Sequence, residues 1–172
     1  KGEMLGVLAL IIGGGFYLSN LHGFLGFDVI SPWVGVPLTF IGLVGLINAI
    51  NLIDGIDGLC SGVALMDCMF FGFCFYYFGS IEYTLMCGVL SASIVPFFFV
   101  NLFGKRSKMF MGDSGALMVG FLLGVMAIKF CEVDVAVRGT FSVGAAPGVV
   151  FSALAIPILD TLRLFVARSL RG

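Results

Sequence analysis

Two short polar segments interrupt an otherwise apolar chain, and both contain side chains that could bind ions or phosphate. The first, residues 48–59, carries two amides, two carboxylates and two glycines: Asn48, Asn51, Asp54, Asp57, Gly55 and Gly58. Amide and carboxylate oxygens are hard ligands of the kind that Mg²⁺ prefers, and glycine lets backbone approach a ligand closely. The pattern favours a divalent-cation site, although a helix end capped by Asn and Asp and terminated by glycine would look similar.

The second polar segment, residues 105–115, combines positive charge with a predicted helix start. Three basic residues supply the charge: Lys105, Arg106 and Lys108. Asp113 lies at the N-cap position of the apolar run that follows, and Ser114 adds a hydroxyl. Free N–H groups at a helix N-terminus attract phosphate, and basic neighbours strengthen that attraction. We expect a phosphate-binding site here; the simpler alternative is an Asp cap beside ordinary topology-setting charges.

An acidic metal site and a basic phosphate site, set beside lipid, would together suit one kind of reaction. A soluble nucleotide would pass a phosphoryl-linked group to a lipid acceptor, because metal ions that bridge pyrophosphate oxygens neutralise the charge on the leaving nucleotide. That chemistry requires the elements between the two segments to bring both to one side of a membrane.

The composition indicates the solvent that surrounds those elements. Of 172 residues, 60% are hydrophobic and 11% are charged, a balance that favours a lipid bilayer over water. The net charge of −1 argues against nucleic acid as a partner, which would need a basic stripe. We expect an all-α fold, a polytopic transmembrane helix bundle with spans near residues 4–19, 34–50, 59–79, 83–101, 114–131 and 148–167.

Residues 20–33 connect the first two predicted spans. They contain glycine, proline and aromatic residues, which favour an irregular or hairpin-like segment at the interface, with Trp33 as an anchor. No repeat or linker divides the chain, so we expect residues 1–172 to form a single transmembrane domain.

The basic residues predict the orientation of the spans. Six of them share a side with the two polar segments: Lys1, Lys105, Arg106, Lys108, Arg168 and Arg171. The opposite side keeps Lys129 and Arg138 beside several acidic residues. Because positive residues mark the cytoplasm, both polar segments are expected to be cytoplasmic, with His22 across the membrane.

Asp67 lies inside the predicted span 59–79, some two turns beyond the first polar segment. An ionisable residue at membrane depth is a functional-site candidate. Pairing or protonation inside the bundle would explain Asp67 equally well, and the sequence names no partner for it.

At the two polar segments the chain resembles the polyprenyl-phosphate N-acetylhexosamine-1-phosphate transferases. The motifs that carry the resemblance are Asn48-x-x-Asn51-x-x-Asp54-Gly-x-Asp57-Gly-Leu59 and Phe110-Met-Gly112-Asp113-Ser114-Gly115. The Asn-Leu-Ile-Asp-Gly run and the late Pro157-Ile-Leu-Asp160-Thr-x-Arg163 resemble the undecaprenyl-phosphate GlcNAc-1-phosphate branch more than the phospho-MurNAc-pentapeptide branch.

The resemblance implies transfer of a sugar-1-phosphate from a UDP-N-acetylhexosamine to undecaprenyl phosphate, with release of UMP. This would be the first membrane step of a cell-envelope glycan such as lipopolysaccharide or capsule. The implied cofactor is Mg²⁺, with Mn²⁺ as a substitute, and the implied location is a bacterial inner (plasma) membrane with a cytoplasmic active site. The other partners are membrane lipids; a homodimer is compatible with the sequence, which leaves the oligomeric state open.

The family's functional residues can be carried over position by position. Asn51 and Asp113 would hold the metal, and Asp54 and Asp57 would be catalytic, lining the nucleotide side or assisting acceptor attack. The remaining matched or neighbouring polar residues would bind substrate: Asn48, Lys105, Arg106, Lys108 and Ser114.

The chain also departs from the family pattern. Family members carry an Asp-Asp pair upstream, a histidine-rich loop downstream and more spans, and neither motif occurs in these 172 residues. We therefore expect an internal fragment or a truncated form of the enzyme, which would be inactive alone.

Other classes of membrane protein fit the sequence less well. An ion-coupled transporter or channel would bind ions near the bilayer midplane, usually between inverted repeats, whereas this acidic cluster falls at one edge and no repeat is visible. A CDP-alcohol phosphotransferase would need Ala-Arg where this chain has Ile56-Asp57. A purely structural subunit gives no reason for so many desolvated acids.

Overall fold

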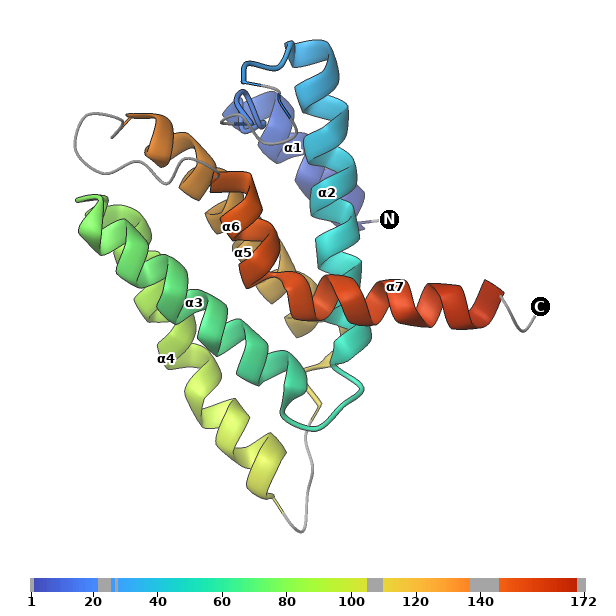
Figure 1. Cartoon of the computed structure of the whole chain (residues 1–172). Coiled ribbons are helices and arrows are strands. Elements are labelled where there is room, and N and C mark those ends of the chain that lie inside the picture. Colours follow the sequence, from blue (N-terminus) through green and yellow to red (C-terminus); the bar gives the residue numbers. More distant parts are fainter. Residues whose placement is uncertain (1, 22–25, 27, 105–109, 137–145, 170–172) are drawn as a thin grey trace.

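The computed structural model describes residues 2–21, 26, 28–104, 110–136 and 146–169 (Figure 1). Their elements are α1 (Gly2–Gly14), α2 (Pro32–Ile53), α3 (Leu59–Tyr77), α4 (Ile81–Phe103), α5 (Gly112–Ala136), α6 (Ala146–Ala153) and α7 (Ala155–Ser169). In this part of the chain the only extended pairing is one isolated bridge. The expectation of an all-α bundle is confirmed.

Within the described ranges, four helices are long and apolar enough to cross a bilayer: α2, α3, α4 and α5. A helix rises about 1.5 Å per residue, so roughly 20 residues match a hydrocarbon core of about 30 Å. Large apolar side chains also cover much of the outer surface, among them Phe73 and Ile81. The protein is therefore an integral membrane protein, and the spans expected at 34–50, 59–79, 83–101 and 114–131 correspond to these helices.

The first expected span differs from its prediction. Residues 4–19 were expected to cross the membrane, but α1 has 13 residues, about 20 Å of helix, and ends at Gly14. Gly15 adopts the left-handed conformation with φ 63°, which ends the helix because glycine pays no steric penalty there. The described residues thus contain four full-length spans, or five when α6 and α7 count as one, in place of six.

The last expected span, 148–167, is broken in two. Helix α6 ends at Ala153, and α7 leaves it at an angle of 64°. Pro157 explains the break, because its ring lacks an N–H and clashes with the carbonyl of the residue four positions earlier, which is Ala153. Figure 1 shows α7 crossing α2 and leading away to the C-terminal end.

The connector between α1 and α2 is a short hairpin, as the sequence predicted. Asn20 and Val29 form an antiparallel bridge. The Leu21 N–H donates to the Asp28 carbonyl at 2.7 Å, and the Ile30 N–H donates to the Ser19 carbonyl at 3.0 Å. Trp33, 90% exposed, follows at the start of α2. His22 lies outside the described residues.

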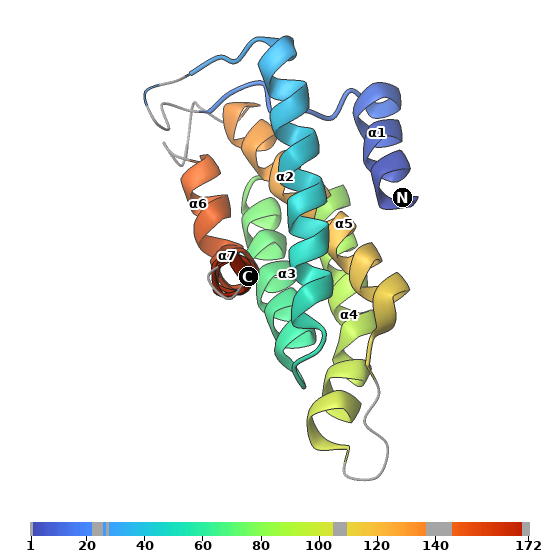
Figure 2. The same ribbon diagram turned by 90° about the vertical axis from the view of Figure 1, so that its right-hand side faces the viewer.

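Close contact between α2 and α5 organises the bundle. The two helices run antiparallel and side by side (Figures 1 and 2). A Cβ built on Gly120 of α5 would lie 2.9 Å from the Ile47 Cα, and one on Gly124 would lie 2.4 Å from the Leu43 Cδ2. Only glycine allows this approach, which brings the end of α2 to the start of α5.

The second large contact joins α3 and α4, and α5 packs against α3 to close the core. Aromatic side chains fill it: the rings of Phe71 and Phe130 lie 5.8 Å apart and are both fully buried. This packing brings four helix ends to the same end of the bundle: the C-terminal ends of α2 and α4 and the N-terminal ends of α3 and α5 (Figure 1). These are the helix ends that flank the two polar segments.

Candidate active site

The two polar segments meet, although the residues that join them lie 58 and 62 positions apart in the sequence. The Asn51 side-chain amide donates to Asp113 Oδ1 at 3.4 Å. Asn51 is half-buried in the last turn of α2, and Asp113 is exposed in the first turn of α5. Antiparallel packing of α2 on α5 makes this meeting unavoidable, since the end of one helix then faces the start of the other.

Asp54 makes a second link between the segments. Its Oδ2 accepts a hydrogen bond from the Gly112 N–H at 3.0 Å. Gly112 is the first residue of α5, and the first N–H groups of a helix have no partner within it. Asp54 therefore caps α5 from a loop 58 residues away, and in doing so fixes the position of Asp113, the next residue.

The loop that carries the acids, residues 54–58, is held from α4. The Gly58 N–H donates to Asn101 Oδ1, and the Asn101 side chain is 3% exposed. Gly58 has φ 73°, and a Cβ there would lie 2.9 Å from the Leu102 Cδ1. The positive φ favours glycine here, and a Cβ would also displace the Leu102 side chain. Asp57, half-buried, precedes it in this fixed loop.

Sequence reasoning missed Asn101. Its signal was a single amide closing the apolar run 83–101, just before the basic residues. A polar side chain in that position is easily taken for an interfacial residue, and only the fold shows that it bonds the first polar segment.

Asn48 lies one turn before Asn51, and its contacts are different. The Asn48 amide donates to the Val44 carbonyl at 2.8 Å and to Glu3 Oε1 at 3.4 Å. Glu3, in the first turn of α1, thereby joins the polar end of the bundle as a further carboxylate. The sequence did not assign it to the site, because α1 had no predicted contact with α2.

The predicted phosphate-binding residues are only partly described. Ser114 is exposed in the first turn of α5, beside Asp113. The three basic residues lie outside the described residues: Lys105, Arg106 and Lys108. Their role therefore stays a prediction.

The donor set fits a magnesium ion that substrate would complete. Among the residues that the structure describes, no three His, Cys, Asp or Glu side chains gather closely enough to hold a metal by themselves. Mg²⁺ is commonly held by one or two carboxylates together with waters and substrate phosphates. Asn51 and Asp113 supply one amide and one carboxylate in contact, and the 3.4 Å hydrogen bond between them is long, so little is lost when both turn to a shared ligand.

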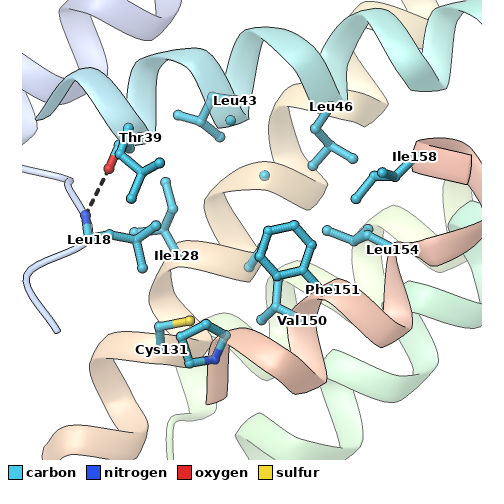
Figure 3. A pocket seen from close by; sticks show the side chains of 15 residues that line it. Leu18, Thr39, Leu43, Leu46, Ile128, Cys131, Val150, Phe151, Leu154 and Ile158 are labelled. Carbon is cyan, nitrogen blue, oxygen red and sulfur yellow. Dashed lines mark hydrogen bonds between the residues drawn. The ribbon is translucent and has the colours of Figure 1, made fainter. Parts of the chain in front are cut away.

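An apolar cavity of about 130 Å³ lies deeper in the bundle, between α2, α5 and α6 (Figure 3). No charged side chain lines it. Leu43 and Leu46 face Ile128, Phe151 and Leu154 across it. At its rim the Leu18 N–H donates to Thr39 Oγ1 at 2.9 Å. A cavity of about this volume accepts a small hydrocarbon group.

Comparison with known proteins decides the family. The family model described as glycosyl transferase family 4 matches residues 2–131. The chain belongs to glycosyl transferase family 4. This confirms the resemblance that the two polar motifs carried.

Curated members of glycosyl transferase family 4 match beyond the motifs. The relative from Escherichia coli (strain K12) is 27% identical over 168 residues, covering 96% of this chain and 44% of the relative. The Yersinia pestis relative is 29% identical over 117 residues, covering 66% and 32%. The Haemophilus influenzae relative is 38% identical over 114 residues, covering 64% and 32%.

All three relatives carry one name, undecaprenyl-phosphate alpha-N-acetylglucosaminyl 1-phosphate transferase. The chain spans less than half the length of these curated relatives.

Proposed function

We propose that the protein takes part in transferring GlcNAc-1-phosphate from UDP-GlcNAc to undecaprenyl phosphate, releasing UMP. The names of its relatives support undecaprenyl phosphate as the acceptor and N-acetylglucosaminyl 1-phosphate as the transferred group. The single observation that carries the proposal on this chain is the contact between Asn51 and Asp113, which joins the two motifs at one end of the helix bundle.

In the proposed reaction a phosphate oxygen of the lipid acceptor attacks the phosphorus that bears the sugar. A new P–O bond forms there, the pyrophosphate P–O bond breaks, and its electron pair leaves on the phosphate of UMP. The product is a lipid-linked sugar diphosphate. Bound Mg²⁺ would supply charge neutralisation at the pyrophosphate oxygens.

Each polar residue has a proposed part in this step. Asn51 and Asp113 hold the metal through their side-chain oxygens. Asp57 takes the proton that an incoming acceptor phosphate still carries, since a carboxylate within hydrogen-bond reach acts as a general base. Asp54 keeps the start of α5 in place and, with Asp57, lines the nucleotide side.

Substrate contacts complete the proposed site. Asn48 and Ser114 border the metal pair on either side along α2 and α5, and donate to sugar or phosphate oxygens. The basic residues between α4 and α5 are proposed to bind the nucleotide's phosphates: Lys105, Arg106 and Lys108. Basic side chains and a helix N-terminus are the usual partners of phosphate.

We propose that the polar end of the bundle faces the cytoplasm at a bacterial inner membrane. The charges that accompany this end in the sequence are mainly positive, in line with the positive-inside rule. A nucleotide sugar would then arrive from water, and the prenyl chain from lipid. A transporter is not favoured, because Asn51 and Asp113 meet at helix ends and the relatives are named as transferases.

The test is release of UMP from UDP-GlcNAc in membranes that express the complete gene, with undecaprenyl phosphate added and Mg²⁺ varied. Asp113→Asn removes a metal-binding charge and is expected to lower turnover by about 100-fold or more. Asp28→Asn makes the same chemical change in the hairpin at the opposite end and should leave turnover as it is. Full turnover by Asp113→Asn would refute the metal assignment.

A further inference from the structure

Asp67 is a buried acid without an evident partner. It lies eight residues after the start of α3, about 12 Å along the helix axis, and so near the middle of that 19-residue span. The residue is 4% exposed, and its Oδ2 has no hydrogen-bond partner within the described part of the chain. The α3 backbone offers no donor, because mid-helix N–H groups are already bonded within the helix.

A groove of about 540 Å³ borders this acid. It lies where α6 stops at Ala153 and α7 turns away, so the Pro157 break leaves space beside α3. Asp67, Met66 and Phe70 line it on α3, and Ser152 lines it on α6. Small-molecule sites have volumes in this range, about 300–1,000 Å³, and Met66 is 65% exposed, so the groove is open at the surface of the described bundle.

The chemistry of the lining selects for positive charge. None of the described residues that line the groove is Lys, Arg or His, so none of them balances the charge of the Asp67 carboxylate. The Phe70 ring adds a face that attracts cations, and the Ser152 hydroxyl adds a hydrogen-bond acceptor. Met66, Val149 and Ile156 make the rest of the wall apolar.

We propose that the groove between α3 and the α6–α7 break binds a lipophilic amine. Its ammonium head lies against the Asp67 carboxylate and the Ser152 hydroxyl, and its alkyl chain follows Met66 and Ile156 toward lipid. An acid at membrane depth is tolerated when it pairs with a cation, and a bound ammonium supplies one. The site is separate from the polar end, because α3 carries Asp67 about two turns away from the Asp54–Gly58 loop.

The proposal is tested with radiolabelled dodecylamine and the protein from its complete gene, reconstituted in nanodiscs of neutral lipid. We expect saturable binding of one dodecylamine per chain, and at least about a tenfold weaker affinity for Asp67→Asn, because a desolvated ammonium loses its counter-charge. Glu82→Gln removes an exposed acid at the start of α4 and should bind as the unchanged protein does.

A second variant distinguishes weaker binding from a folding defect. Ser152 is exposed, so Ser152→Leu should fold normally while filling the groove, and it is expected to weaken dodecylamine binding as well. Dodecanol, which has the same chain without the charge, should not compete. Equal binding by Asp67→Asn, competition by dodecanol, or no saturable binding in the unchanged protein would each overturn the proposal.

Discussion

Asp54 at the polar end of the bundle and Asp67 in the middle of α3 differ in their hydrogen bonding. Asp54 lies in a loop and accepts a hydrogen bond from the Gly112 N–H at 3.0 Å. Asp67 lies in a helix, is more deeply buried, and has an oxygen that no described residue satisfies.

The difference follows from where helices offer donors. The first N–H groups of a helix are free, so an acid that reaches a helix start is satisfied by backbone alone. In mid-helix those groups are used within the helix, and an acid must find a side chain, a water or a ligand. Location along a helix, rather than burial alone, therefore decides whether an acid in a membrane protein is bonded within the fold or available to a ligand.

The largest effect should come from Gly120→Ala. The added Cβ would meet the Ile47 backbone at 2.9 Å, so α2 and α5 must separate and the polar end loses its alignment. We expect a loss of about 2 to 3 kcal/mol in the free energy of unfolding, the usual cost of overpacking. Thermal or SDS-induced unfolding in micelles, followed by circular dichroism, measures it.

The matched control is Gly42→Ala on α2. A Cβ there meets nothing within 4 Å, so stability should stay the same or rise slightly through better helix propensity. If Gly120→Ala and Gly42→Ala had the same free energy of unfolding, the close α2–α5 contact would not be what holds the polar end in alignment.

Asn101→Leu is the next variant in size of effect. It leaves the Gly58 N–H buried without an acceptor, which costs about 2 kcal/mol. The free energy of unfolding in micelles reports this loss. Asn48→Ala provides the comparison: its side chain is exposed, so its removal should cost no more than about 0.5 kcal/mol. If Asn101→Leu and Asn48→Ala lost the same free energy of unfolding, the buried hydrogen bond between Gly58 and Asn101 would stabilise the protein no more than an exposed one.

Removing the cap at Asp54 should have a smaller effect. Asp54→Ala leaves the Gly112 N–H to water and is expected to cost about 1 kcal/mol, the typical value for a lost N-cap. Asp54→Asn keeps an acceptor oxygen and should cost less. Amide hydrogen exchange at Gly112 gives a local measure, and unchanged protection in Asp54→Ala would contradict the capping role.

Asp67→Leu should raise the free energy of unfolding slightly, the smallest of these effects. Replacing an unsatisfied buried acid by an apolar side chain is expected to add about 0.5 kcal/mol to the free energy of unfolding. The same unfolding measurement applies. A clear loss of stability in Asp67→Leu would show that Asp67 has a structural partner. The difference drawn between Asp67 and Asp54 would then be wrong.

Much of the fold could be predicted from the sequence because hydropathy governs it. The four long spans and the meeting of the two polar segments follow from apolar run lengths and from the alternation of antiparallel helices. The hairpin pairing of Asn20 with Val29 agrees with the glycine, proline and aromatic residues of the connector. The differences between prediction and structure lie at glycine and proline. Gly13–Gly15 shortened the first span, and Pro157 broke the last one, because neither residue lowers hydropathy enough to interrupt an apolar run.

The candidate site was predicted in residue types and less well in contacts. Asn51 and Asp113 were expected to converge, and they do. The hydrogen bonds that Gly58 donates to Asn101, Gly112 donates to Asp54 and Asn48 donates to Glu3 join residues 43 or more positions apart. Such pairs depend on helix register and crossing geometry, which sequence spacing does not encode.

The glycine contact between α2 and α5 also sets how accurately Asp113 is aimed. Gly120 acts as a fulcrum, and Asp113 lies seven residues away, at the end of a lever arm of about 10 Å. A tilt of about 5° around that fulcrum would swing the carboxylate by nearly 1 Å, a displacement that is enough to cost an enzyme about two orders of magnitude in rate. The precision of the polar end is therefore fixed in the hydrocarbon, well away from any group that does chemistry.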